Sequence, residues 1–201
     1  MVPLMKKIAL LITLFILLIG CKEEAIDTDA LVYEEARKLK PFTLINKNNE
    51  KIDNNAFTGG WNLLFLGYTS CPDICPMTLS KLKSVKSSLQ ADFNIKVWLI
   101  SVDPARDTAE KLLQYTNYFD PEFIGATAGH KDLFPFVRDL GLMYAMADEN
   151  RDNYSVDHSA SIALVSPQGE LKAIFKPEFK VGSAPTINTA SLIADFKKIV
   201  K

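Results

Sequence analysis

The sequence is poor in the residues that mark specialised protein classes. Its 201 residues include only three cysteines, two histidines and nine glycines, and 23 basic residues stand against 24 acidic ones. The low glycine content excludes a collagen-like chain, and without an excess of positive charge no nucleic-acid-binding surface is indicated. With 48% hydrophobic residues but a single long apolar run, the chain is neither disordered nor a multi-span membrane protein. The composition predicts an ordinary globular domain, in which each cysteine and histidine needs its own explanation.

The single long apolar run lies at the start of the chain. Lys6 and Lys7 precede residues 8–20, which are apolar except for Thr13. Thirteen helical residues span roughly 20 Å, less than the ~30 Å of a bilayer core, and such a short run after positive charge is typical of an export signal. The run ends in Leu18-Ile19-Gly20-Cys21, which resembles the lipobox of bacterial lipoproteins.

The lipobox resemblance implies that residues 1–20 are a lipoprotein signal peptide and that Cys21 is acylated after cleavage. The alternative is an uncleaved signal anchor with an incidental cysteine. Without Lys6 and Lys7 the mature chain has 21 basic and 24 acidic residues. We expect it to be anchored to the cell membrane by lipid on the extracytoplasmic side, which is the periplasmic side in a Gram-negative cell.

The residues after Cys21 have the composition of a linker. Ten of the nineteen residues 22–40 are charged, and none is glycine or proline. Residues 31–40 are compatible with a short helix, but a solvated spacer explains the charge better. We therefore predict a lipid-anchored charged linker over residues 21–40 and a folded domain over residues 41–201.

Strand and helix patterns alternate through this domain. Residues 42–52 predict a small N-terminal hairpin, and the apolar runs 62–68 and 95–102 predict strands buried on both faces. The remaining patterns are helices near 79–89, 107–119, 131–140 and 192–199 and strands near 123–126, 161–165 and 171–175. This order predicts an α/β fold with a central sheet flanked by helices.

Two cysteines lie where the first buried strand meets its helix, in Thr69-Ser70-Cys71-Pro72-Asp73-Ile74-Cys75-Pro76. A helix N-terminus stabilises thiolate, which is both the nucleophile of disulfide exchange and a soft ligand for Cu(I). A four-residue spacing lets both sulfurs approach one ion or each other. A static disulfide is the structural alternative, but so small a loop restrains the unfolded chain little. The pair is therefore interpreted as functional and redox-active.

The two histidines differ in their surroundings. His130 follows Gly129 near a predicted helix start and is interpreted as a surface group, whereas His158 directly precedes a buried strand. Two sulfurs and an imidazole suit copper, while zinc in a closed site would require a fourth ligand. We expect Asp157 or a backbone carbonyl to orient His158. Residue chemistry alone leaves metal binding and redox chemistry both open.

Three ordered motifs resemble those of the Sco/SenC family of thioredoxin-fold copper proteins. They are Phe65-Leu66-Gly67-Tyr68-Thr69-Ser70-Cys71-Pro72-Asp73-Ile74-Cys75-Pro76, Ser101-Val102-Asp103-Pro104-Ala105-Arg106-Asp107-Thr108 and Val156-Asp157-His158-Ser159. The resemblance covers residues 41–200. It implies a thioredoxin-like fold and a copper site on Cys71, Cys75 and His158, with copper bound as Cu(I) or Cu(II).

The family resemblance also implies a function in cytochrome c oxidase assembly. The protein would deliver copper to the dinuclear centre of oxidase subunit II, or reduce the cysteines of that centre, and would need a copper donor and a thiol reductant as partners. With such a function the protein would be a metallochaperone, with thiol–disulfide reductase activity as a possible enzymatic function. The alternatives are a metal-independent thiol–disulfide oxidoreductase and a peroxide-removing or redox-sensing protein using Cys71 and Cys75.

Several further residues receive structural interpretations. Asp107 has the spacing of a helix cap, and Arg106 is expected to pair with a carboxylate. The methionines near the motifs are expected to be packing residues. They are Met77, Met143 and Met146.

Overall fold

The computed structural model describes residues 26–146, 154–182 and 184–201. The predicted signal peptide, the lipidation site Cys21 and the first residues of the predicted linker lie outside these described residues. Within the described ranges, the structure has no helix with the length and apolar character needed to cross a membrane.

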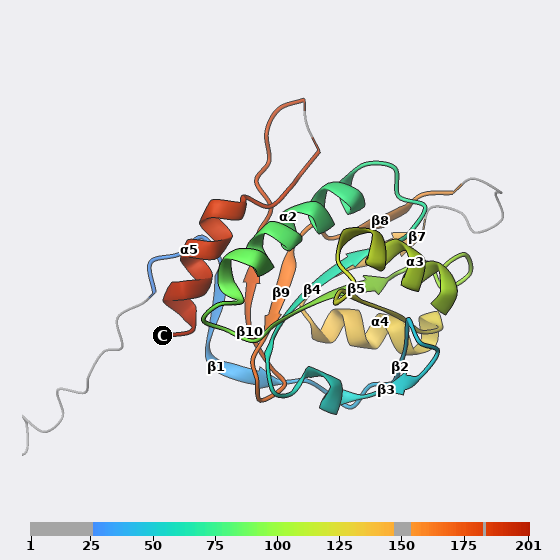
Figure 1. Ribbon diagram of the computed structural model, residues 1–201, viewed down its shortest axis with the longest axis horizontal. Helices are drawn as coiled ribbons and strands as arrows, with labels where there is room; N and C mark the ends of the chain where they lie inside the picture. Colours follow the sequence, from blue (N-terminus) through green and yellow to red (C-terminus); the bar gives the residue numbers. More distant parts are fainter. Residues whose placement is uncertain (1–25, 147–153, 183) are drawn as a thin grey trace, which may run out of the picture.

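A mixed sheet of eight strands forms the centre of the molecule (Figure 1). In spatial order its strands are β1 (Leu31–Lys38), β10 (Glu170–Phe175), β9 (Ile162–Val165), β4 (Trp61–Gly67), β5 (Ile95–Ser101), β6 (Ile124–Thr127), β2 (Leu44–Asn46) and β3 (Lys51–Ile52). The pairs β4–β5 and β5–β6 are parallel, and every other neighbouring pair is antiparallel. A separate antiparallel pair joins β7 (Tyr144–Met146) to β8 (Val156–His158).

Helices cover both faces of the sheet. The helices are α2 (Ile74–Leu89), α3 (Ala109–Phe119), α4 (His130–Asp139) and α5 (Thr189–Ile199), and a 3-10 turn, η1 (Asn54–Phe57), precedes β4. Figure 1 shows α2, α3 and α5 on one face and α4 on the other. The predicted α/β fold, with a central sheet flanked by helices and an N-terminal hairpin made by β2 and β3, is confirmed.

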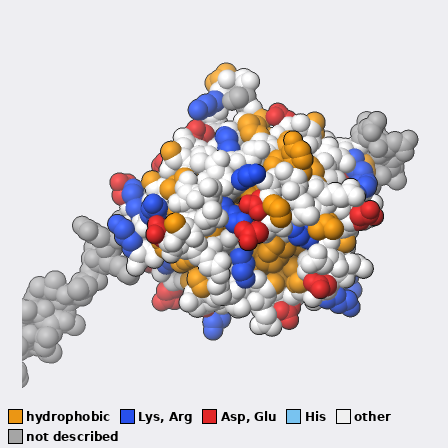
Figure 2. Space-filling view, in the orientation of Figure 1, with side chains coloured by type: hydrophobic (Ala, Val, Ile, Leu, Met, Phe, Trp, Pro, Cys, Tyr) orange, Lys and Arg blue, Asp and Glu red, His pale blue; other side chains and the backbone are white. Residues whose placement is uncertain are grey.

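The central strands hold the core. β4 is buried at every position but its first, and in β5 Lys96 alone is half-exposed. Helices cover both faces of the sheet, so the side chains on both sides of these strands are buried. Consecutive residues must therefore nearly all be apolar, and the strands appear in the sequence as continuous apolar runs. Figure 2 shows basic and acidic side chains interspersed with apolar areas, the broadest of them beside a central group of charged side chains.

The structure corrects the interpretation of residues 31–40. Residues 31–38 are neither a helix nor a solvated spacer but strand β1, which pairs with β10 at the edge of the sheet. Arg37 of this strand forms an ion pair with Asp139 at the end of α4, with 2.8 Å between Nη1 and Oδ1. An edge strand is stabilised by backbone hydrogen bonds and tolerates charged side chains, so its charge is compatible with a place in the sheet.

One helix boundary differs from expectation and another is confirmed. The N-cap of α3 is Thr108, whose hydroxyl accepts from the backbone N–H of Lys111 at 3.3 Å, so the interpretation of Asp107 as the cap is wrong. In α4, Pro135 lies inside the helix. The predicted end of this helix is confirmed, because Gly141 follows it with a φ of 71° in the left-handed region.

Candidate metal centre

The cysteine segment leaves the sheet at the carboxyl end of β4 and enters α2. Cys71 lies in the connecting loop, where its N–H donates to the carbonyl of Tyr68 at 3.2 Å, and Cys75 is the second residue of the helix. Cys75 is fully buried and Cys71 is half-buried, and neither forms a disulfide. One sulfur is thus open to an approaching molecule, while the other lies beneath it.

His158 ends strand β8 and faces the cysteine segment. Its Nε2 lies 3.5 Å from Sγ of Cys75, a residue 83 positions earlier in the chain. The ligand atoms of Cys71, Cys75 and His158 all lie within 4.8 Å of one another. Among the described residues, these three are the one group of three or more histidine, cysteine or acidic side chains that converges closely enough to hold a metal ion.

Neighbouring groups fix the orientation of the His158 imidazole. Its Nδ1 lies 3.1 Å from the carbonyl oxygen of Ser159, and an oxygen acceptor there requires Nδ1 to carry the proton. The ring also meets Phe65 and Tyr68 edge-to-face, with centroid distances of 5.7 and 6.1 Å. The Nε2 lone pair is therefore available on the side of the sulfurs. Of the two expected orienting groups, a backbone carbonyl is the one found.

The two sulfurs differ in protonation. A hydrogen bond from the Cys75 thiol lowers the pKa of Cys71 to about 4 against the opposing effect of burial, assisted by the backbone N–H groups of Asp73 and Cys75. The same hydrogen bond, together with burial, raises the pKa of Cys75 far above its usual value. In the reduced protein near neutral pH, the pair therefore holds one thiolate and one thiol.

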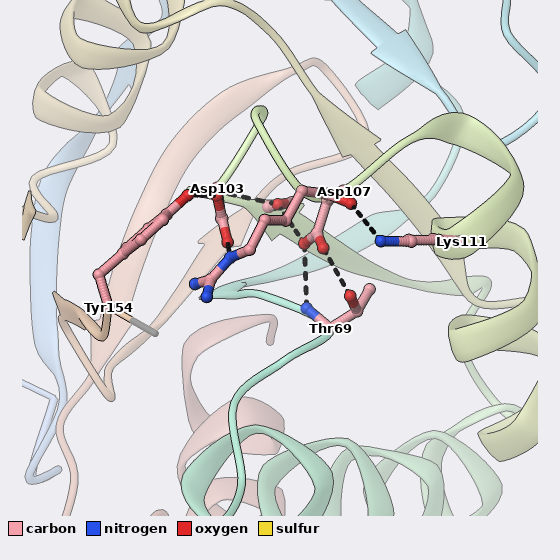
Figure 3. A network of polar contacts seen from close by, with 7 residues as sticks. Thr69, Asp103, Asp107, Lys111 and Tyr154 are labelled. Atoms are coloured by element: carbon pink, nitrogen blue, oxygen red, sulfur yellow. Dashed lines mark hydrogen bonds and ion pairs between the residues drawn. The ribbon is translucent and has the colours of Figure 1, made fainter. Parts of the chain in front are cut away.

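Asp107 anchors the loop that carries Cys71. Its buried carboxylate accepts from the backbone N–H of Thr69 at 3.0 Å, from the Thr69 hydroxyl at 2.5 Å and from the Ser101 hydroxyl at 2.6 Å. Figure 3 shows this carboxylate directed at Thr69 from the loop between β5 and α3. The sequence identified Asp107 but assigned it the wrong partner.

A second buried carboxylate in the same loop reaches the segment that carries His158. Asp103 accepts from the hydroxyl of Tyr154 at 2.5 Å and from Nε of Arg106. The expected pairing of Arg106 with a carboxylate is thus confirmed. Sequence reasoning missed Tyr154 because no spacing connects it to the distant Asp103.

Gly67, the last residue of β4, was also missed as a site residue. A Cβ built at this position would lie 2.9 Å from both Sγ of Cys75 and Cδ1 of Leu99. Glycine is therefore required here because the strand passes so close to the sulfur. The one feature of the sequence that could have indicated this role is the position of Gly67 at the end of a buried strand, shortly before Cys71.

The remaining candidates lie outside the three-residue group. Nδ1 of His130 is 2.8 Å from the hydroxyl of Tyr144. Met143 is 72% exposed, so its interpretation as a packing residue is wrong, whereas Met77 and Met146 are half-buried.

The donor set fits a soft metal ion. Two sulfurs, one of them already a thiolate, and one imidazole nitrogen match the ligand preference of copper, and a hard cation such as Mg²⁺ would require oxygen ligands. The group has three members, whereas a structural zinc site normally has four ligands.

Comparison with known proteins identifies the family. The SCO1/SenC family model matches residues 32–190. The chain belongs to the SCO1/SenC family. A SCO2-like protein of Rickettsia prowazekii is 35% identical over 142 residues, which cover 69% of each chain.

Solved Sco structures share the fold. The chain is similar to Arabidopsis thaliana ScoI with copper bound, with 28% identity, a TM-score of 0.69 and coverage of 81% of this chain and 97% of that one. It is also similar to copper-bound Bradyrhizobium japonicum ScoI, with 26% identity, a TM-score of 0.64 and coverage of 81% and 99%. The predicted thioredoxin-like architecture is confirmed by these likenesses.

Proposed function

We propose that this protein binds one copper ion through Cys71, Cys75 and His158 and delivers it to the dinuclear copper centre of cytochrome c oxidase subunit II. The observation that carries the proposal is the convergence of three soft donor atoms within 4.8 Å. Copper in the two solved ScoI proteins supports the choice of metal. Membership of the SCO1/SenC family supports the choice of pathway, because another protein with this fold, BsSco, is described as a member of the Sco family of cytochrome c oxidase assembly proteins.

The site chemistry suits transfer by ligand exchange. The half-buried Cys71 is open to an incoming thiolate, while the buried Cys75, with Nε2 of His158 3.5 Å from its sulfur, would hold the ion. Each protein–copper bond is replaced by a bond to the acceptor, so the metal is never released to water. A copper donor loads the site, and a thiol reductant keeps both cysteines reduced.

Anaerobic Cu(I) titration of the reduced protein against a chromophoric chelator tests this proposal. We expect one tightly held copper per chain and a loss of at least about 10- to 100-fold in affinity for His158→Ala, because removing a ligand costs no less than removing a group that orients one. His130→Ala is the matched control, since it removes the other histidine, which contacts Tyr144 instead. Failure of the reduced protein to compete for copper, or equal affinity of the His158→Ala and His130→Ala variants, would overturn the three-ligand site.

Reduction of disulfides in the same oxidase centre is the second candidate function. The low pKa of the half-buried Cys71 favours it, because a stable thiolate beside a buried thiol is the arrangement of a nucleophile and its resolving partner. Cys71 would attack a substrate disulfide and release one substrate thiolate. Cys75, after losing its proton, would then attack Sγ of Cys71, release the second substrate thiolate and leave a Cys71–Cys75 disulfide for the external reductant to reduce.

The two functions differ in their dependence on His158. Disulfide reduction needs only the cysteines, so His158→Ala should retain turnover on an oxidised peptide bearing the two cysteines of the acceptor centre. Copper delivery to the reduced form of that peptide should decline in the same variant. Loss of both activities in Cys71→Ser, a change at the half-buried sulfur, is expected under either function.

We further propose that acylated Cys21 anchors the domain to the outer side of the cell membrane. The lipobox-like sequence before Cys21 supports this. The Asp27 carbonyl accepts from Nζ of Lys198 at 2.6 Å and Ala30 packs against the core, so the free spacer is residues 22–26. Five residues reach about 17 Å when extended. Metabolic labelling with a radioactive fatty acid should mark the wild-type protein and leave Cys21→Ser unlabelled. Labelling of that variant would contradict the assignment.

A further inference from the structure

The three proposed copper ligands come from two separate segments of the chain. Cys71 and Cys75 follow β4, whereas His158 ends β8. Between these segments lies the loop of residues 102–108, which joins β5 to α3 and contributes no ligand. We propose that this loop is a positioning clamp, which holds one segment with Asp107 and the other with Asp103 and so sets the distance from His158 to the two sulfurs. The inference rests on the proposed copper site.

The cysteine segment is held at Thr69, two residues before Cys71. Asp107 accepts both the backbone N–H and the hydroxyl of Thr69, so this carboxylate fixes the backbone and the side chain together. Ser101, the last residue of β5, donates to the same carboxylate. The start of the metal loop is thereby tied to the end of a central strand.

The histidine segment is held at Tyr154, four residues before His158. The Tyr154 hydroxyl donates to Asp103, and the Arg106 guanidinium lies over the Tyr154 ring with 3.7 Å between Cζ and the ring centroid. Arg106 also lies 5.5 Å from the ring centroid of Tyr68, which belongs to the cysteine segment. Arg106 thus contacts both halves of the site at once, and the Tyr68 ring in turn meets the His158 imidazole.

The clamp loop is itself rigidly held. The backbone N–H groups of Arg106 and Asp107 both donate to the carbonyl of Asp103, at 3.2 and 2.9 Å. Lys111 donates from Nζ to the carbonyl of Arg106 at 2.9 Å, and Figure 3 shows it approaching the loop from α3, with Tyr154 and Thr69 reaching the two carboxylates from other directions. Contacts on several sides leave the loop little freedom to follow either segment.

Stability alone does not account for two buried carboxylates in one short loop. Asp103 is fully buried and Asp107 is 1% exposed. Apolar residues of similar volume often stabilise a protein as well as a buried ion pair does, because burying charge costs solvation energy. Hydrogen bonds to a carboxylate also impose a specific geometry on the groups that donate them. Here the donors are Thr69, which binds Asp107, and Tyr154, which binds Asp103.

Two conservative variants separate the halves of the clamp. Tyr154→Phe removes the hydroxyl that donates to Asp103, and Thr69→Val removes the hydroxyl that donates to Asp107. Each should weaken Cu(I) binding by the full-length protein in detergent about tenfold. In a His158→Ala background Tyr154→Phe should have no further effect, since it acts through the imidazole, while Thr69→Val should still weaken binding. Equal losses for Tyr154→Phe in both backgrounds, or no loss in either, would overturn the clamp.

A measurement without copper tests the clamp independently of the proposed function. In the reduced, metal-free protein, NMR contacts between the rings of His158 and Phe65 should weaken in Tyr154→Phe. They should persist in Arg37→Met, which breaks an Arg–Asp pair between edge strand β1 and the end of α4. Unchanged ring contacts in Tyr154→Phe would overturn the clamp even where copper binds. If the wild-type protein binds no copper but the ring contacts weaken in Tyr154→Phe as expected, the proposed function is overturned and the clamp is supported.

Discussion

Gly67 and Cys75 lie so close together that one additional carbon atom on Gly67 would come within 2.9 Å of the sulfur. The strand that supplies the centre of the sheet therefore passes directly against the buried ligand of the proposed site. The packing of the core and the position of the Cys75 sulfur therefore depend on each other. Both require that the residue at position 67 has no side chain.

Gly67→Ala tests this relationship. The added methyl group meets Sγ of Cys75 and Cδ1 of Leu99, so we expect a loss of about 1–3 kcal/mol in the free energy of unfolding from overpacking. Displacement of the sulfur should also weaken copper binding. Chemical denaturation and the chelator titration measure the two effects. Gly129→Ala is the control, because a Cβ at Gly129 meets no atom within 4 Å.

The reactivity of Cys71 should be nearly independent of pH across the neutral range. Its pKa of about 4 means that the thiolate is formed well below pH 7, so alkylation by iodoacetamide should have a plateau above about pH 5 and decline only as the pH falls toward 4. Cys75→Ala removes the principal hydrogen-bond donor and should move this decline to higher pH. A wild-type midpoint between pH 8 and 9, the ordinary thiol range, would contradict the assignment.

Strand β1 should contribute to the stability of the domain. A chain beginning at residue 41 lacks the pairing with β10 and the Arg37–Asp139 ion pair that a chain beginning at residue 26 retains. We expect a lower thermal midpoint for the shorter chain by several degrees, since loss of about 1 kcal/mol already shifts such a midpoint by roughly 2–4 °C in a domain of this size. Equal midpoints would mean that the edge pairing adds nothing to stability.

Asp120 should give the protein an acid-sensitive component of stability. Burial opposes its ionisation, but the backbone N–H of Glu122 and the ammonium of Lys86, 3.2 Å away, hold its pKa below the ordinary value. A lowered pKa stabilises the folded state above the unfolded pKa of about 4, and this contribution is lost as the pH falls through the folded value. Asp120→Asn should therefore be less stable than wild type at pH 7, and the difference should close in acid. The same substitution at the exposed Asp92 is the control.

Much of the fold was predictable because its central strands are buried on both faces. β4 and β5 must be apolar throughout, and this requirement is visible in a short window of sequence. β1 escaped prediction for the opposite reason. Four of its eight residues are charged, and its partner β10 lies far along the chain, so its stability comes from backbone bonds that leave no local pattern.

Some residues of the candidate site are likewise recognisable in the sequence, and others are revealed only by the folded chain. Cys71 and Cys75 are recognisable from their spacing, and His158 joined them through the order of the family motifs. The partner of Asp107 was missed because a capping spacing is compatible with both Asp107 and Thr108, and only the folded chain brings Thr69 from 38 residues away. Gly67 matters because it has no Cβ to collide with the Cys75 sulfur, and a residue pattern does not show which atoms lie near a glycine in the folded chain.

The 83 positions from Cys75 to His158 link metal retention to the completion of folding. The two sulfurs belong to one local segment and are present as soon as α2 forms. The imidazole joins them only where the later part of the chain has folded back, because His158 lies just before β9, which pairs with β4. An unfinished chain therefore offers copper two donors, and a finished one offers three. Full-strength copper retention is thus a property of completed molecules, so that exchange with a cellular copper donor would itself discriminate against immature chains.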